Sequence, residues 1–155
     1  MSRTGTRAAL VVAFRIVVAL LFSLHGAATL FGVFGGDYHS GGHAAPLFSW
    51  PGWWAGLIQL VGGLLVLVGL FTPVAAVICS GSMAYAYFTV HQPHALLPLN
   101  NGGDLPAIFC WSFLLIAVLG AQRWSVDAVL AERRGRRSPA ASAMAATPEV
   151  SAAEV

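Results

Sequence analysis

The sequence predicts an all-α membrane protein: a four-helix transmembrane bundle with both termini in the cytoplasm. Only 9% of the 155 residues are charged and 57% are hydrophobic, whereas about a quarter of a soluble domain is charged. No Lys or Arg occurs between Arg15 and Arg123, and the carboxylates of that interval are Asp37 and Asp104. Because an ionised side chain at the bilayer centre costs about 2.5 kcal/mol or more, this interval belongs in lipid.

Four apolar stretches cover most of this interval and extend slightly beyond it, at about 8–34, 53–71, 74–90 and 105–124. Each is near the roughly 20 residues that a helix needs to cross about 30 Å of hydrocarbon. Helices are expected because the period-two alternation of a β-barrel is absent and the chain is too short for its strands. We therefore expect one membrane domain over residues 1–130.

The first stretch sets the orientation. Arg3 and Arg7 precede it, which places the N-terminus in the cytoplasm by the positive-inside rule. A cleaved signal peptide is the alternative, but the apolar run continues to Phe34, beyond the usual length of about 7 to 15 residues. Arg15 lies within the predicted span, so we expect it to form a structural ion pair with Asp127 or to reach the headgroups.

The second and third stretches are joined by the short connection Thr72-Pro73, which predicts a tight cytoplasmic hairpin. Cys79 falls near the cytoplasmic end of the third span and Cys110 in the outer part of the fourth. We expect different depths to keep them farther apart than the roughly 7 Å Cα limit of a disulfide. Without a C-x-x-C motif, buried and inert thiols are expected.

The fourth stretch is followed by basic residues, which place the C-terminus in the cytoplasm as well. The segment 131–155 is basic and then rich in Ala, Ser and Pro, so we expect a disordered tail. Its basic part suits anionic lipid headgroups, and nucleic-acid binding is not indicated. These basic residues are Arg123, Arg133, Arg134, Arg136 and Arg137.

Unusual polar side chains gather on the predicted outer side. His25 and Gln59 lie inside spans, where polar groups face the bundle and need partners. His91, Asn101 and Asp104 belong to the outer loop before the fourth span. These five form a candidate polar or quinone site, with interhelical hydrogen bonding as the structural alternative. Asp104 is also expected to satisfy free amides at the start of the fourth helix.

Metal and haem sites are weakly indicated. His39 and His43 are four residues apart, but the glycines between them argue against a helix that would hold both imidazoles on one face, so no metal site is predicted. A bis-histidine haem would need His25 and His91 at one depth, and only His25 is clearly within a span. We favour loop histidines exposed to water, His94 among them.

Taken together, these residues resemble the DoxX family, which is similar to the small DoxD-type subunit of thiosulfate:quinone oxidoreductases. The resemblance covers most of residues 8–130. It implies a four-helix inner-membrane fold and an association with membrane redox complexes and quinone reduction. Glu is common in the family where Gln59 stands here, and an amide cannot relay a proton. The resemblance rests on Arg15, His25-Gly26, Gln59-Leu60-Val61-Gly62-Gly63, Gly69-Leu70-Phe71-Thr72, Ala86-Tyr87-Phe88, Asn101-Gly102-Gly103-Asp104, Gly120 and Trp124-Ser125-Val126-Asp127.

Two functions follow from these expectations. The resemblance implies a multi-pass inner-membrane subunit of a quinone-linked or oxidative-stress redox complex, with quinone as ligand and a partner protein supplying electrons, since no complete catalytic constellation is visible. The alternative is a non-catalytic anchor or assembly factor. The partners expected are the lipid bilayer, redox or other complex subunits and a second copy of the chain. A transporter is disfavoured because no pair of broken helices is present.

Overall fold

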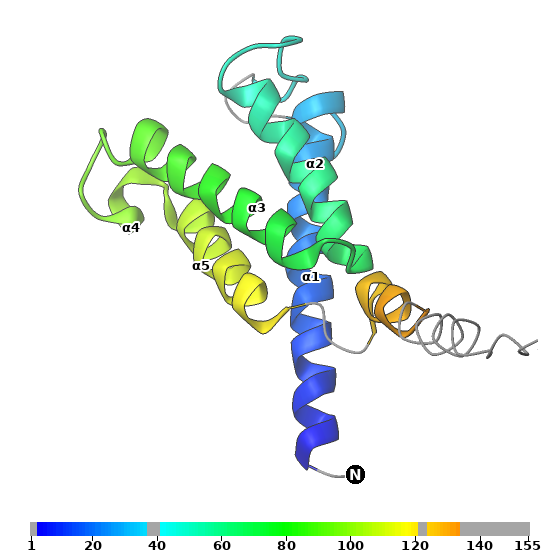
Figure 1. The fold of residues 1–155 in the computed structure, drawn as a ribbon. Coiled ribbons are helices and arrows are strands. Elements are labelled where there is room, and N and C mark those ends of the chain that lie inside the picture. The colour runs from blue at the N-terminus through cyan, green and yellow to red at the C-terminus, as the bar shows by residue number, and fades with distance from the viewer. Residues whose placement is uncertain (1–2, 37–40, 121–123, 134–155) are drawn as a thin grey trace, which may run out of the picture.

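The computed structural model describes residues 3–36, 41–120 and 124–133. This part of the chain is helical and contains no strand, which confirms the predicted all-α class (Figure 1). A π-helix, η2, continues α3 directly, and residues 126–133 form a further helix. The other elements are α1 (Arg3–Phe31), α2 (Gly52–Val68), α3 (Thr72–Ala86), η2 (Tyr87–His91), α4 (Pro98–Asn101) and α5 (Asp104–Leu119).

Glycines end the first two long helices. Gly32 follows α1 with φ +67° and Gly69 follows α2 with φ +75°, a backbone region that glycine enters without steric cost. At the end of α2 the Gly69 N–H donates to the Val66 carbonyl and the Leu70 N–H to the Leu65 carbonyl. These two bonds form a Schellman cap, so α2 stops in time for the tight turn into α3.

The long helices form two pairs. α1 packs chiefly on α2, and α3 packs chiefly on α5, while α2 and α3 join the pairs (Figure 1). Glycines allow the close approach within the first pair. A Cβ at Gly26 would collide with the backbone N of Leu60, and a Cβ at Gly56 would lie 2.8 Å from Thr29 Cγ2. Such contact between small residues is how helices associate in lipid.

The core lies where the two pairs cross. Phe22 of α1 contacts two aromatic rings of α5, with centroid separations of 4.5 Å to Phe113 and 5.1 Å to Phe109. Beyond this crossing, α1–α2 and α3–α5 diverge toward one end of the molecule, as Figure 1 shows. The other fully buried side chains of this core include Ala19, Val66, Ala76, Cys79 and Ile116.

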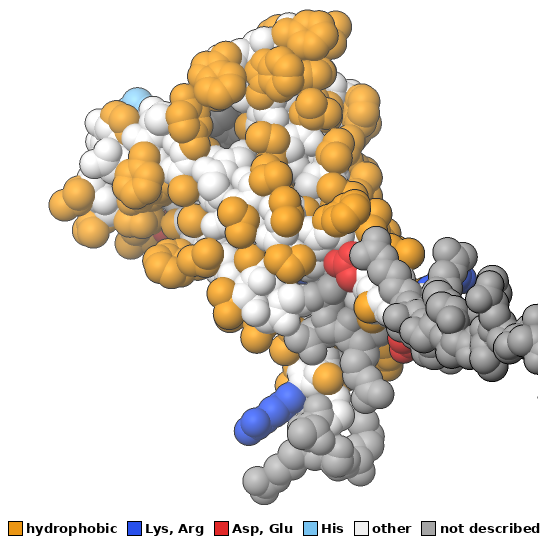
Figure 2. Space-filling view, in the orientation of Figure 1, with side chains coloured by type: hydrophobic (Ala, Val, Ile, Leu, Met, Phe, Trp, Pro, Cys, Tyr) orange, Lys and Arg blue, Asp and Glu red, His pale blue; other side chains and the backbone are white. Residues whose placement is uncertain are grey.

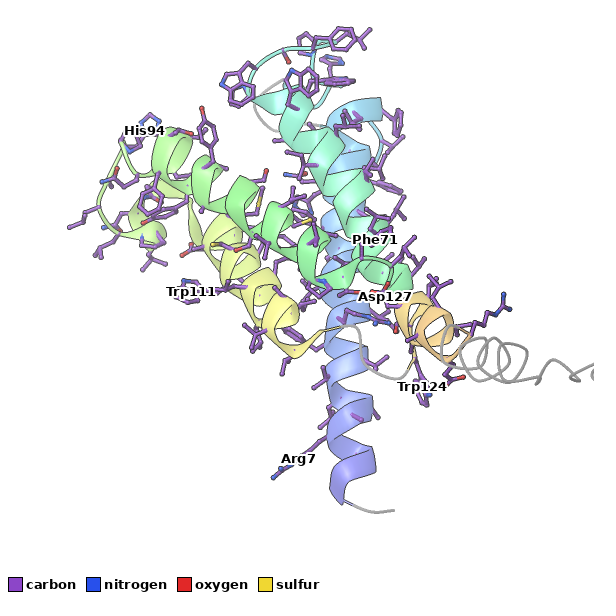
Figure 3. All side chains as sticks on the ribbon, viewed as in Figure 1. Arg7, Phe71, His94, Trp111, Trp124 and Asp127 are labelled. Atoms are coloured by element: carbon purple, nitrogen blue, oxygen red, sulfur yellow. The ribbon has the colours of Figure 1, made fainter. Side chains whose placement is uncertain are left out.

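The outward surface of the bundle is apolar. Hydrophobic side chains cover most of the face in Figure 2, and Trp111 projects away from α5 in Figure 3. Two helical segments, Gly5–Phe31 and Thr72–His91, are long and apolar enough to cross a membrane, while α2 and α5 are apolar but have 17 and 16 residues. The expectation of four spans is thus met in part, and orientation stays a prediction.

The structure changes details of the expected helices. α1 ends three residues before the predicted Phe34, and the third helix runs from Thr72 to His91 with a π-helical end that no pattern indicated. The predicted separation of the cysteines by depth is wrong, because Ser80, the neighbour of Cys79, donates a hydrogen bond to the Cys110 carbonyl at 2.8 Å. Both thiols are nevertheless free.

Several predicted features lie outside the described residues. They include Asp37 and His39 of the first loop and residues 134–155 of the tail. The first three tail residues, 131–133, are described and continue the last helix. Four of the basic residues also lie outside the described residues: Arg123, Arg134, Arg136 and Arg137.

Candidate functional site

A cavity of about 730 Å³ lies between the two helix pairs where they diverge. We call this part of the molecule the cavity end. Its volume is within the roughly 300–1,000 Å³ typical of small-molecule sites. Three of the five predicted site residues line it: His25 from α1, Gln59 from α2 and His91 from η2. Most of the wall is apolar or aromatic, with Phe22, Ile58, Met83, Leu105, Pro106 and Phe109.

A backbone carbonyl of its own helix determines which ring nitrogen of His25 carries the proton. Its Nδ1 lies 3.1 Å from the carbonyl oxygen of Leu21, one turn earlier. Because a carbonyl oxygen can only accept, Nδ1 is the nitrogen that carries the proton. In the neutral imidazole, Nε2 is therefore a hydrogen-bond acceptor. The ring meets Phe109 edge-on at 5.9 Å between centroids, which places it against α5 as well.

Gln59 lies on α2, the helix that packs against α1. Gly26, next to His25, packs against the backbone of Gln59 and Leu60, so a close contact between α1 and α2 places the two polar side chains on one wall. Within the described chain, Gln59 Oε1 is buried and has no hydrogen-bond partner. A buried acceptor without a partner costs about 1 to 3 kcal/mol. Because this atom has less than 1 Å² of accessible surface, a ligand could reach it only after the side chain moves.

His91 ends the π-helix and is held by the following loop. Its Nδ1 lies 3.1 Å from the carbonyl oxygen of Asn101. The Asn101 side chain fixes that loop twice, donating from Nδ2 to the Ala95 carbonyl and accepting at Oδ1 from the Gly103 N–H, both at 2.7 Å. Gly103 in turn lies against the ring of Tyr87, where a Cβ would be 2.8 Å from ring carbons. Asn101 therefore positions His91.

Asn101 and Asp104, the remaining predicted site residues, do not line the cavity. Asp104 is exposed in the first turn of α5, and Gly103 is the N-cap of that helix. A carboxylate in the first turn is favourable to the helix dipole. The structure thus places Asp104 at the start of the helix, as expected, but beside the site rather than in its wall.

Two aromatic residues at the cavity were not anticipated. Trp50, just before α2, meets Tyr85 of α3 edge-on with 5.6 Å between ring centroids, and both line the cavity. This contact joins the two helix pairs where they diverge. The sequence shows that both rings are present, but nothing in its local pattern indicates that loop and helix meet.

A second polar cluster occupies the opposite end, around the turn between α2 and α3; we call it the turn-end cluster. Asp127 caps the start of α3: Oδ1 accepts from the Phe71 N–H at 3.0 Å, and Oδ2 accepts from the Thr72 N–H and Oγ1 at 3.1 and 3.2 Å (Figure 3). Arg15, which is buried, donates from Nη2 to the Trp124 carbonyl at 2.7 Å. The predicted partners Arg15 and Asp127 therefore both tie the segment 124–127 to the bundle.

The electrostatics of this cluster favour an ionised carboxylate. Burial acts to raise the pKa of Asp127, but the hydrogen bonds from Thr72 and Phe71, together with the positive charge of Arg15, outweigh it and hold the pKa below its usual range. The Asp127 N–H also donates to the Gly69 carbonyl at 3.0 Å. Side chain and backbone thus act together at the turn.

The loop histidines lie elsewhere. His43 and His94 are exposed and do not line the cavity, and Figure 3 shows His94 at the edge of the loop after η2. Among the described residues, no three His, Cys, Asp or Glu side chains gather as a metal site would require. The cavity is accordingly the candidate site of this chain.

Comparison with known proteins gives two matches. The DoxX family model matches residues 10–92, a span that contains His25, Gln59 and His91. An uncharacterised protein of Haemophilus influenzae is 38% identical over 120 residues, which cover 73% of this chain and 84% of that one. No solved structure matches significantly.

Proposed function

The chain belongs to the DoxX family, and we propose that it binds a lipophilic quinone as a subunit of a quinone-linked or oxidative-stress redox complex. In this proposal it is a multi-pass protein of the inner membrane with four spans and both termini in the cytoplasm. The cavity end then faces the outer leaflet.

Helix surfaces support the membrane part of the proposal. Side chains such as Leu10, Trp111 and Val118 are 65%, 71% and 80% exposed. In water so many exposed apolar side chains would be costly, whereas lipid is their natural solvent. The shorter helices α2 and α5 pack along α1 and α3, so the proposal places them in the bilayer beside these longer partners.

The cavity carries the proposal of a ligand. Its apolar wall suits a ring with a hydrocarbon tail, and His25, Gln59 and His91 supply a small number of polar groups able to orient ring oxygens. The apolar cavity with these three polar residues in its wall is the observation on which the ligand rests. His25 and His91 can exchange protons, whereas the Gln59 amide can only form hydrogen bonds.

A protein partner completes the proposed complex. Cys79 is buried against Gly62 in the core and Cys110 lies on the neighbouring helix, so the two free thiols do not form a redox pair at the cavity. The proposal therefore assigns electron transfer to a partner subunit and ligand binding to this chain.

The test is purification of the full chain in mild detergent, followed by mass spectrometry of extracted lipids and by ultraviolet-visible spectroscopy. We expect quinone to co-purify and to fall severalfold in His25→Ala, because the substitution removes a polar contact and part of the wall. His94→Ala is the matched control, since this histidine lies outside the cavity, and it should retain the wild-type quinone content.

Two outcomes would contradict the proposal. A stable co-purifying protein with no quinone, and no binding of added short-chain quinone, would favour the anchor or assembly factor. A haem absorption band that disappears in His25→Ala would assign the cavity to a bis-histidine haem instead.

A further inference from the structure

Two loops at the cavity end expose large apolar side chains. We call residues 44–51, before α2, and residues 95–103, before α5, the end loops; neither contains a charged residue or a histidine. Leu47 of the first is 75% exposed and Leu99 of the second is 82% exposed, and Figure 2 shows hydrophobic side chains at this end of both helix pairs. Exposed apolar patches mark surfaces that bind protein or membrane. The other exposed apolar side chains of the end loops are Phe48, Trp50, Leu96 and Leu97.

The helices that follow the end loops are short for a bilayer. α2 has 17 residues and α5 has 16, so at a rise of about 1.5 Å per residue they are about 25 and 24 Å long. The hydrocarbon of a bilayer is about 30 Å thick. Each end loop leads directly into its helix, at Gly52 and at Asp104. The end loops therefore extend the apolar surface of both short helices toward the same face of the membrane.

Aromatic side chains at this end are of the kind that favours the boundary between headgroups and acyl chains. Trp and Tyr are enriched at that boundary, and Trp50, Trp53, Trp54 and Tyr85 all lie here. Phe48 packs on Trp53 with 4.8 Å between ring centroids, which holds the first end loop against α2. Irregular backbone exposed to lipid is excluded from the hydrocarbon itself but not from the boundary. The boundary therefore suits both the side chains and the backbone of the end loops.

The end loops also border the cavity. Trp50 of the first and Gly102 of the second line it. Tyr85 and Leu105 line it as well, and both side chains are exposed, so they lie at its opening. Among the described residues that form the wall, none is Asp, Glu, Lys or Arg. The surroundings of the end loops are thus the surroundings of the cavity mouth.

We infer that the end loops bind the phospholipid of the outer leaflet at the boundary of headgroups and acyl chains, so that the cavity opens to lipid and takes up its ligand from the bilayer. This inference deepens the proposed function and rests on it for the orientation of the chain. The ligand class is then an amphiphile that diffuses within the leaflet. The exposed side chains of His94 and Asp104, which flank the second end loop, reach the headgroups and water.

The experiment measures the surroundings of the end loops by spin labelling of the full chain in vesicles of phosphatidylcholine and phosphatidylglycerol. Leu47→Cys and Leu99→Cys carry the nitroxide, in a Cys110→Ala background where the remaining Cys79 is buried. Collisions with oxygen, which concentrates in lipid, are compared with collisions with a nickel chelate, which stays in water. We expect the ratio of oxygen to nickel collisions to be severalfold higher at both sites than at His94→Cys, the exposed control beside the second end loop.

Two further sites separate this inference from the proposed function. Trp111→Cys, on the exposed face of α5, reports whether the bundle lies in the bilayer, and its ratio should be high. Leu105→Cys reports the cavity mouth and should give a ratio like that of Leu47→Cys. Leu96→Cys, also exposed, replaces Leu99→Cys if that variant does not fold.

Three outcomes would contradict the expectation. A high ratio at Trp111→Cys, with ratios at Leu47→Cys and Leu99→Cys as low as at His94→Cys, would place the end loops in water and overturn the inference while the membrane protein stands. Infrequent collisions with both reagents at the end loops would show contact with a second copy of the chain and would overturn it as well. A low ratio at Trp111→Cys would mean that the proposed function itself fails.

Discussion

The two ends of the bundle use polar side chains in different ways. At the turn-end cluster, the Asp127 carboxylate accepts three hydrogen bonds and Arg15 donates to the Trp124 carbonyl. At the cavity end, Gln59 Oε1 has no partner within the described residues, and His25 bonds only through Nδ1 to its own helix among the contacts described.

The comparison teaches that a polar residue in an apolar bundle has two distinct meanings. Where its hydrogen bonds link separate segments, as Asp127 links 124–127 to the α2–α3 turn, it stabilises the fold. Where a buried acceptor lacks a partner in the described chain, as at Gln59 Oε1, it costs stability. Opposite effects of similar substitutions at the two ends would demonstrate this.

The largest effect is expected at the turn-end cluster. Asp127→Asn should lower the free energy of unfolding by about 2 to 3 kcal/mol, because an amide loses the charge and turns a donor toward N–H groups. Unfolding can be followed in mixed micelles by the reaction of buried Cys79 with a thiol reagent, in a Cys110→Ala background. If the Asn variant is as stable as the parent, the turn-end cluster does not stabilise the fold and the comparison fails.

The pH dependence of stability provides a second test of Asp127→Asn. The folded pKa of Asp127 is depressed, so its stabilisation is complete above the unfolded value of about 3.9 and is lost as pH falls through the folded pKa. The stability deficit of Asp127→Asn should therefore be constant between about pH 5 and pH 8 and shrink below about pH 4. A deficit that changes near neutral pH would point to another group.

A smaller loss is expected where α1 and α2 touch. Gly26→Ala should cost about 1 to 3 kcal/mol and weaken ligand binding, because the new Cβ collides with the backbone of α2 and displaces Gln59 from His25. Gly81→Ala on α3 is the matched control, since a Cβ there meets no atom within 4 Å, and it should be neutral or slightly stabilising. Equal effects of the two substitutions would show that the α1–α2 contact does not depend on Gly26.

The smallest expected change in the free energy of unfolding has the opposite sign. Gln59→Leu should leave stability unchanged or raise it by up to about 1 kcal/mol, because it removes a buried acceptor that lacks a partner in the described chain. The reaction of Cys79 with a thiol reagent in mixed micelles, as used for Asp127→Asn, measures it. A clear loss of stability would mean that Gln59 has a structural role like that of Asp127.

The sequence was sufficient for the helices because they depend on local properties. Apolar length predicted the four long helices, and Thr72-Pro73 marked the turn, although Gly32 ended α1 earlier than the apolar run suggested. The depth of Cys110 was misjudged because it depends on how α3 and α5 slide past each other, which the contact from Ser80 fixes. Composition carries no information on that register.

The candidate site was predicted in its polar members but not in its geometry. His25, Gln59 and His91 stood out because polar groups are rare in such a chain, and the structure brings these three to one cavity. Whether Asn101 faced the cavity or held a loop could not be read from its type, since an amide does either. The Trp50–Tyr85 contact depends on tertiary packing alone.

Because of the π-helix, the number of residues in the segment before His91 matters for its direction as much as their identity does. A π-turn takes up one more residue than an α-turn, so η2 amounts to a one-residue insertion in the third helix. Removing a single residue from 87–90 would restore an α-helix and leave His91 on nearly the same face, whereas an α-helix of unchanged length would rotate it by about 100° about the axis. A relative with a regular α-helix here would therefore need one residue fewer between Ala86 and the histidine to direct it to the same place, and counting those residues distinguishes the two cases.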